Sequence, residues 1–194
     1  TFLNINNVKL VGGFAGGETD TAARDFIANE TILSGDIGIA ANHTDNSYHV
    51  LLASGAAGNG GIDGFTITHG QADVSTNFTL NGNIVYNNYG AGMYVHSASP
   101  FLSHCRFMNN YASGNGGAFA AINSNSSFSK NHFSSNSAGN KGGAVSLQQC
   151  SSTINNTVFS ANSVNGPGPN NLAGGLYAEN ASLHVFGNSF LSNS

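Results

Sequence analysis

Three charged residues in the first third of the chain have the types needed for a catalytic cluster. We expect Asp36 and Asp63 to approach one another on adjacent turns of the chain, with Arg24 near them. Clustered carboxylates bind Ca²⁺ and an Arg can act as a base, so these residues would suit a calcium-dependent lyase. The alternative is structural, with Arg24 in a buried ion pair with Asp25 or Asp36, or with all of them solvated at corners. We favour the structural interpretation and assign no catalytic residue, metal or cofactor.

The remaining residues offer little acid–base chemistry. No Asp or Glu occurs between residues 74 and 178, so this half cannot supply the carboxylate pair of a glycoside hydrolase. The seven His residues do not share one repeat position, since His104 lies three residues before a Phe and His132 lies one before. We therefore expect most of the His residues to be exposed strand or corner residues, not metal ligands.

The two cysteines, Cys105 and Cys150, lie 45 residues apart and at different repeat positions. Nearly two turns of stacked chain would separate them by about 8 Å along the stack, which exceeds the Cα separation of a disulfide. The sequence therefore predicts two free thiols.

Composition excludes several classes of protein. Charged residues make up 7% of the 194 residues, while hydrophobic residues make up 40% and Gly numbers 26. This pattern favours a β-rich protein with many turns over surface helices or disorder. The net charge is −4 with five Lys and Arg, which argues against a nucleic-acid partner. No apolar run is long enough to span a membrane. Abundant Asn and Ser are typical of secreted chains.

A repeat of a large apolar residue, two further residues and then Asn organises the second half. The spacings between the Phe residues are 26, 26 and 31. The repeat pairs are Phe107 with Asn110, Phe133 with Asn136, Phe159 with Asn162, and Phe190 with Asn193. The stretch 85–88 (Val-Tyr-Asn-Asn) is interpreted as an earlier copy. We expect the Phe residues to form an interior stack and the Asn residues an amide ladder.

A second apolar position lies five residues before each repeat residue, with a polar pair between the two. The residues at this position are Leu80, Leu102, Phe128, Ile154 and Val185, with Ile62 and Ile67 showing the same offset one turn earlier. An offset of five cannot place both side chains on one face of a straight strand, because side chains alternate with period two. The sequence therefore predicts a two-residue corner, for which Asn and Gly tolerate the left-handed conformation.

A third position is a Gly pair followed by an apolar strand. Its copies are 116–119, 142–145 and 174–177, with the second Gly at Gly117, Gly143 and Gly175, and a degenerate copy at 90–94. The longer last spacing is explained by an insert around residues 165–169 that forms a loop at one corner.

These patterns predict an all-β fold, a right-handed parallel β-helix with three short strands in each coil of about 25 residues. We expect a single domain over 1–194, with irregular coils over 1–80 and regular coils over 81–194, as one stretch of a longer chain. Strands are expected at 8–11, 31–35, 49–52 and 64–68. Residues 18–29 are expected to leave the coil, with one helical turn.

The Gly-Gly-Ala and Phe-x-x-Asn copies over residues 85–194 resemble the repeats of the chlamydial polymorphic outer membrane proteins. The stretches 11–16, 31–36 and 63–67 are similar to the opening of large bacterial surface proteins with a pectin-lyase-like β-helix. The resemblance implies a secreted or surface-displayed, adhesin-like region of bacterial origin, with autotransporter passengers among its relatives.

Three functions remain open at this point. The favoured one is a non-enzymatic extracellular scaffold or stalk whose partners are a host or neighbouring cell surface or a glycan. The second is binding or cleavage of a polysaccharide along a strand face, since this fold also carries lyases and hydrolases. The third is a filament in which copies stack end to end.

Overall fold

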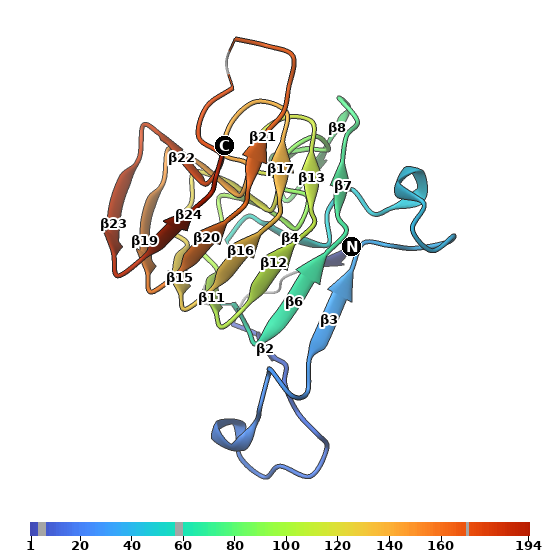
Figure 1. Ribbon diagram of the computed structural model, residues 1–194, viewed down its shortest axis with the longest axis vertical. Helices are drawn as coiled ribbons and strands as arrows, with labels where there is room; N and C mark the ends of the chain where they lie inside the picture. Colours follow the sequence, from blue (N-terminus) through green and yellow to red (C-terminus); the bar gives the residue numbers. More distant parts are fainter. Residues whose placement is uncertain (4–6, 57–59, 170) are drawn as a thin grey trace.

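The computed structural model describes residues 1–3, 7–56, 60–169 and 171–194. Successive strands wind into a parallel solenoid whose coils stack along one axis (Figure 1). Three six-stranded parallel sheets run along this axis, and we name them sheets A, B and C. They confirm the predicted fold of three strands per coil. A short fourth sheet, D, adds two-residue strands between C and A.

The strands are as follows. Sheet A contains β1 (Phe2–Leu3), β4 (Leu51–Ser54), β10 (Met93–His96), β14 (Phe119–Ile122), β18 (Val145–Gln148) and β22 (Leu176–Glu179). Sheet B contains β2 (Lys9–Val11), β5 (Gly61–Asp63), β11 (Phe101–Ser103), β15 (Ser127–Ser129), β19 (Ser151–Asn155) and β23 (Ser182–Phe186). Sheet C contains β3 (Thr31–Ser34), β6 (Phe65–Thr68), β12 (Arg106–Met108), β16 (His132–Ser134), β20 (Val158–Ser160) and β24 (Ser189–Leu191). Sheet D contains β7 (Gln71–Ala72), β13 (Tyr111–Ala112), β17 (Ser137–Ala138) and β21 (Ser163–Val164).

The Phe column forms the predicted interior stack. Phe107, Phe133, Phe159 and Phe190 occupy one register position of sheet C, preceded by Ile67. Ring centroids along the stack lie 4.8, 5.2 and 4.7 Å apart, with interplanar angles of 13°, 7° and 2°. Phe107, Phe133 and Phe159 are fully buried, whereas Phe190 in the last coil is 49% exposed. Each ring therefore depends on the coils above and below it.

The Asn residues of the repeat form the predicted amide ladder. Asn110 donates through Nδ2 to Oδ1 of Asn136 (3.0 Å), Asn136 to Asn162 (2.9 Å), and Asn162 to Asn193 (2.8 Å). Asn136 Nδ2 also donates to the carbonyl oxygen of Phe107 (2.9 Å). Asn110 N also donates to Asn136 Oδ1 (3.1 Å), so the ladder satisfies a backbone N–H group at the corner after sheet C.

The corners use the left-handed conformation, as predicted, and they do so in three columns. The residues are Gly64, His104, Lys130, Asn156 and Gly187 after sheet B; His69, Asn109, Ser135, Ala161 and Ser192 after sheet C; and Gly55, Ser97, Asn123, Gln149 and Asn180 after sheet A, all with φ between 48° and 78°. Several are neither Asn nor Gly. Their backbone N–H groups bond to the next coil, as in His104 N to Ser129 O (3.1 Å), which offsets the local strain.

The expected alignment of the last glycine pair is wrong by one residue. Leu176 pairs with Val145, so Gly174 continues the column of Gly117 and Gly143. A Cβ on Gly117 would come within 2.3 Å of the Gly143 carbonyl oxygen, and one on Gly143 within 2.4 Å of the Gly174 carbonyl oxygen. Gly175 instead follows Ala118 and Ala144, where a side chain has more room. Close backbone approach therefore explains two of the three predicted glycines.

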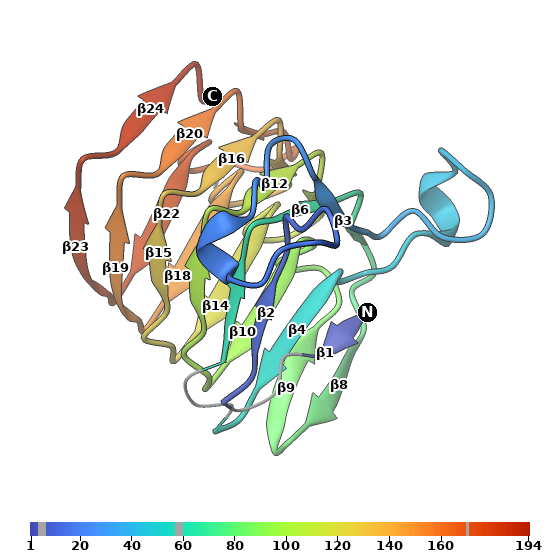
Figure 2. The same cartoon turned by 90° about the horizontal axis from the view of Figure 1, so that it is seen from below.

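The assignment of Leu80 and of residues 85–88 to the repeat is also wrong. They belong to an antiparallel hairpin, β8 (Asn77–Leu80) and β9 (Asn83–Tyr86), which lies outside the coils (Figure 2). Ile67 pairs directly with Phe107, although 40 residues separate them. Val85 is nevertheless buried, because the hairpin packs against Leu52 and Tyr94 on the outer face of sheet A.

The N-terminal coils follow the sequence prediction in part. β2, β3 and β6 match the expected strands to within one residue, whereas β4 shares only Leu51 and Leu52 with the expected strand at 49–52. Residues 12–30 leave the coil with a 3-10 turn, η1 (Thr21–Ala23), which is a longer excursion than the expected 18–29. A second 3-10 turn, η2 (His43–Asp45), lies in the loop between β3 and β4. The insert after β21 extends away from the corner in Figure 1. In the part of the chain described above, no helix has the length and apolar character to cross a bilayer.

Candidate functional site

The charged residues of the first third meet on the outer face of sheet B, but not in the expected combination. Arg24 Nη2 lies 2.7 Å from Asp63 Oδ1, Lys9 Nζ lies 2.9 Å from Asp63 Oδ2, and His104 Nδ1 lies 3.1 Å from Asp63 Oδ1. The Asp63 and Arg24 side chains are only 6% and 9% exposed. Arg24 therefore pairs with Asp63, and the expected pairing with Asp25 or Asp36 is wrong.

The other two carboxylates have local roles. Asp25 accepts hydrogen bonds from the backbone N–H groups of Ile27 and Ala28 (both 2.9 Å), and Asp36 accepts one from Ala41 (3.1 Å) in a different loop. Asp36 and Asp63 therefore have different hydrogen-bond partners and do not form the expected shared cluster.

The Asp63 cluster is a structural clamp for residues 12–30. Arg24 Nη1 also donates to the carbonyl oxygens of Gly12 (3.1 Å) and Asp63 (3.2 Å), and its guanidinium lies 5.7 Å from the centre of the Phe26 ring. Phe26 in turn packs against His104, with ring centroids 5.0 Å apart. Burial opposes ionisation of Asp63, but hydrogen bonds from Arg24 and Lys9 outweigh it and lower its pKa.

The cysteines are two free, buried thiols, as predicted. Burial raises the pKa of Cys105 to about 12, so the unreactive thiol form prevails. Within residues 1–3, 7–56, 60–169 and 171–194, no three His, Cys, Asp or Glu side chains are grouped as metal ligands. His49 is 2% exposed, and its Nδ1 donates to the carbonyl oxygen of Gly90 (3.1 Å). Burial lowers the pKa of His49 to about 4.

The outer face of sheet A carries polar and aromatic side chains of the types that bind ligands. Residues of β14, β18 and β22 alternate, so Leu147 faces the core while Ser146 and Gln148 face outwards. The register places Gln148 beside Ile122 and Glu179, and Ser146 beside Ala120 and Tyr177. On this face the Tyr177 ring lies on the strand nearest the C-terminus, and the small residues Ser146 and Ala120 occupy the same position on the two preceding strands.

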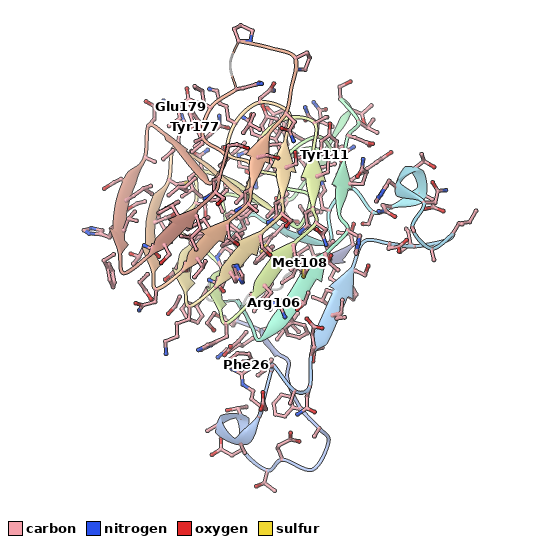
Figure 3. All side chains as sticks on the ribbon, in the orientation of Figure 1. Phe26, Arg106, Met108, Tyr111, Tyr177 and Glu179 are labelled. Atoms are coloured by element: carbon pink, nitrogen blue, oxygen red, sulfur yellow. The ribbon has the colours of Figure 1, made fainter. Side chains whose placement is uncertain are left out.

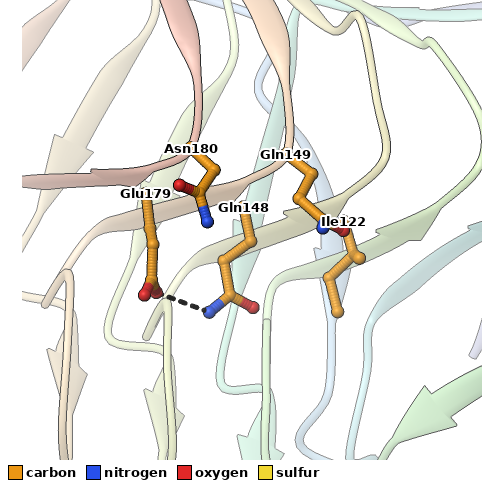
Figure 4. A pocket seen from close by; sticks show the side chains of 5 residues that line it. All are labelled: Ile122, Gln148, Gln149, Glu179 and Asn180. Atoms are coloured by element: carbon orange, nitrogen blue, oxygen red, sulfur yellow. Dashed lines mark hydrogen bonds between the residues drawn. The ribbon is translucent and has the colours of Figure 1, made fainter.

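A shallow groove of about 220 Å³ lies at the edge of this face (Figure 4). We call it the Glu179 groove; its lining residues are Ile122, Gln148, Gln149, Glu179 and Asn180. Gln148 Nε2 donates to Glu179 Oε2 (3.2 Å), a bond that lowers the pKa of Glu179. The volume is below that of most enclosed ligand sites, so the groove suits one unit of an extended ligand.

Lys141 and Tyr177 lie next to Glu179, beside the residues that line the groove. Lys141 Nζ donates to the Tyr177 hydroxyl (2.9 Å) and to Glu179 Oε2 (3.3 Å), and it lies 4.6 Å from the centre of the Tyr177 ring. The hydrogen bond with Tyr177 raises the pKa of Lys141. Figure 3 shows Tyr177 and Glu179 close together, with Tyr111 on a different sheet. The half-buried Tyr177 ring therefore lies next to a hydrogen-bond donor, Lys141, and an acceptor, Glu179.

The side chains beside the Glu179 groove are of types that can recognise a carbohydrate. Amide, carboxylate and ammonium groups beside a tyrosine ring can bind hydroxyl groups and the apolar face of a sugar. Hydrolysis would need a second carboxylate at a defined separation from Glu179. Residues 74–178, which build the neighbouring coils, contain no Asp or Glu.

Sequence reasoning did not single out the residues of the Glu179 groove. The signal was present, because Ile122 and Gln148 are 26 residues apart and Gln148 and Glu179 are 31 apart, the same spacings as the Phe column. Only the exact register shows which polar residues share an outer face.

Comparison with known proteins identifies the architecture only. Neither the curated proteins nor the solved structures contain a match to this chain. The family model of right-handed β-helix regions matches residues 55–194, which is well over half of the chain. Its extent includes the Phe column, the Asn ladder and the Glu179 groove. The chain therefore belongs to the family of right-handed β-helix regions.

Proposed function

We propose that this chain is a non-enzymatic, extracellular β-helix that acts as a rigid, adhesin-like scaffold on a bacterial cell surface. The observation that carries this proposal is the continuous interior, in which stacked Phe rings and the Asn ladder link every coil from Phe107 to Asn193. Such a stack resists bending because each coil is fixed by its neighbours. The resemblance to bacterial surface proteins supports the same conclusion.

The scaffold carries several segments that lie outside its coils. They are residues 12–30, residues 35–48, the β8–β9 hairpin and the insert after β21 (Figure 1). Binding residues are often placed on loops supported by a rigid framework. The chain has few charged residues and many Asn and Ser residues, a composition typical of secreted proteins.

Surface display and lack of turnover can be tested separately. An antibody against residues 165–169 should label intact cells that express the protein, and external protease should remove the signal. Labelling only after lysis would contradict the surface location. Acidic and neutral polysaccharides incubated with the purified chain should yield no new reducing ends or unsaturated products. Any turnover that co-purifies with the folded chain would contradict a non-enzymatic role.

A second candidate function is polysaccharide binding, which the Glu179 groove favours. The half-buried Tyr177 ring, Lys141 and Gln148 present stacking and hydrogen-bonding groups along the coil axis. Successive coils are spaced by about 4.8 Å, so an extended glycan lying across them would contact the same face repeatedly.

A glycan array tests this candidate with matched tyrosine variants. Tyr177→Ala should weaken binding at least tenfold, because it removes the ring that lies next to Glu179. Tyr111→Ala removes a tyrosine that is 36% exposed on sheet D and should leave binding unchanged. Equal effects of the two variants, or no bound glycan, would reject this candidate.

A further inference from the structure

The loop between β3 and β4 contains an unusual set of oxygen atoms. This loop, residues 35–50, projects from the N-terminal coils and includes η2 (Figure 2). Its base is closed by a hydrogen bond from the backbone N of Ser47 to the carbonyl oxygen of Gly35 (2.9 Å). The bond brings Asp36 and Asn46 to the same end of the loop, with Asp45 next to them in the chain.

Two carboxylates accept hydrogen bonds from the backbone of one turn inside this loop. Asp36 Oδ2 accepts from Ala41 N (3.1 Å), and Asp45 Oδ2 accepts from Ile39 N (2.9 Å). The turn is closed by a hydrogen bond from Asn42 N to Ile39 O (3.0 Å). Both carboxylates are therefore held against the same turn by hydrogen bonds to N–H groups two residues apart.

Three further oxygens in this loop are buried without a hydrogen-bond partner among the described residues. They are Asp36 Oδ1, Asp45 Oδ1 and Asn46 Oδ1. Asn46 is only 8% exposed, and its amide is fixed because Nδ2 donates to the carbonyl oxygen of His69 (3.0 Å). Buried oxygens without partners are costly, and charged ones are the most costly.

The charge balance at this loop lacks a cation. Glu30, Asp63 and Glu179 each lie within 3.4 Å of an Arg or Lys. In the described parts of the chain, Asp36 and Asp45 form no such pair, and neither do Glu18, Asp20, Asp25 and Asp73. Asp36 and Asp45 differ from these four because each has a buried oxygen without a partner. A bound cation would supply both the missing charge and the missing partners.

We propose that residues 35–47 form a Ca²⁺ site in which Asp36 Oδ1, Asp45 Oδ1 and Asn46 Oδ1 are ligands. All three donors are oxygens, which suits a hard cation better than zinc or copper. Backbone carbonyls of the loop and water complete the six to eight ligands that Ca²⁺ takes. Mg²⁺ binds more weakly, because it demands strict octahedral geometry and loses its water reluctantly.

Calorimetry and terbium luminescence test the site directly. The protein, freed of metal with a chelator, should bind one Ca²⁺ with saturable heat and a higher unfolding temperature, and Mg²⁺ at the same concentration should have a smaller effect. Tyr48 is two residues from Asn46, so excitation of tyrosine should sensitise bound Tb³⁺, and Ca²⁺ should displace it. Tyr48→Phe should reduce the luminescence without changing the heat of Ca²⁺ binding. Absence of saturable Ca²⁺ binding would overturn the proposal.

Amide variants locate the site and control for misfolding. Asp36→Asn and Asp45→Asn keep an oxygen for the backbone N–H groups but remove the charge, so each should weaken Ca²⁺ binding at least tenfold. In chelator, both should unfold at or above the wild-type temperature, because a buried uncompensated charge is gone. Asp73→Asn, an exposed carboxylate outside the loop, should change neither property. Full Ca²⁺ binding by the Asp36→Asn/Asp45→Asn double variant, or equal weakening by Asp73→Asn, would overturn the proposal.

Discussion

Asn136 is the residue at which the role of the amide ladder can be measured most directly. Its side chain is fully buried and joins three coils. Oδ1 accepts from Asn110 N (3.1 Å) and Asn110 Nδ2 (3.0 Å), while Nδ2 donates to Phe107 O (2.9 Å) and Asn162 Oδ1 (2.9 Å). Asn136→Ala removes the side-chain partners of two backbone groups, Asn110 N–H and Phe107 C=O.

The magnitude follows mainly from Asn110 N–H, because Phe107 C=O lies inside β12 and keeps its ladder bond from Ser134 N–H. A buried polar group left without a partner costs about 1–3 kcal/mol, so Asn136→Ala should lower the free energy of unfolding by about 1–3 kcal/mol. Asn136→Leu keeps a similar volume but makes no hydrogen bonds, so it should cost a similar amount. Urea unfolding followed by circular dichroism measures both losses.

Asn125→Ala provides the control for this measurement. Asn125 is exposed and no hydrogen bond of its side chain is seen in the described structure, so its loss should stay within about 0.5 kcal/mol. The reasoning is refuted if Asn136→Ala costs less than about 1 kcal/mol, or if Asn136→Leu restores wild-type stability. The first result would mean that water replaces the amide, and the second that the amide only fills space.

Three further predictions concern other buried residues. Phe133→Ala should cost roughly 3–5 kcal/mol in denaturant unfolding, because it removes a ring stacked on both sides; a loss below about 1 kcal/mol would contradict the stack. Stability should fall as the pH drops below the ordinary His pKa of 6.5, because the unfolded chain protonates His49 while the folded chain keeps it neutral down to about pH 4. That loss should reach about 2–3 kcal/mol by pH 4.5 and should be smaller in His49→Gln; an equal loss in the variant would assign it elsewhere. Cys105 and Cys150 should resist an aromatic disulfide reagent until the protein unfolds, and rapid labelling of the native protein would contradict their burial.

The repeat could be predicted from the sequence because equivalent residues of neighbouring coils stack directly on one another. The same residue type therefore returns at a fixed interval along the chain. Phe107, Phe133 and Phe159 occupy the same position in successive coils, so all three face the core. Each pairs with the Phe of the neighbouring coil. A column of identical residues therefore shows directly in the spacing. The Asn ladder follows from the same register, since Asn110 and Asn136 occupy equivalent corners.

Insertions are where this reasoning failed. Leu80 and Val85 match the repeat spacing, yet they form a hairpin, and Ile67 pairs with Phe107 instead. Apolar residues five positions apart do not distinguish a corner of the coil from a turn of a hairpin. The Gly175 shift has a similar origin, because the insert after β21 hides the register of the last coil.

The amino-acid sequence by itself determined the stacked coils, the buried Phe column and the Asn ladder, because each depends on residues repeated at a fixed interval. The free thiols followed from the same interval, because Cys105 and Cys150 fall at different positions of the repeat. Only the tertiary structure decided that Arg24 pairs with Asp63, that Gln148 and Glu179 share a groove, and that Asp36, Asp45 and Asn46 each have a buried oxygen without a partner in one loop. These contacts join coils to irregular loops, and their partners are set by where the loops fold back in space, which no periodic pattern encodes.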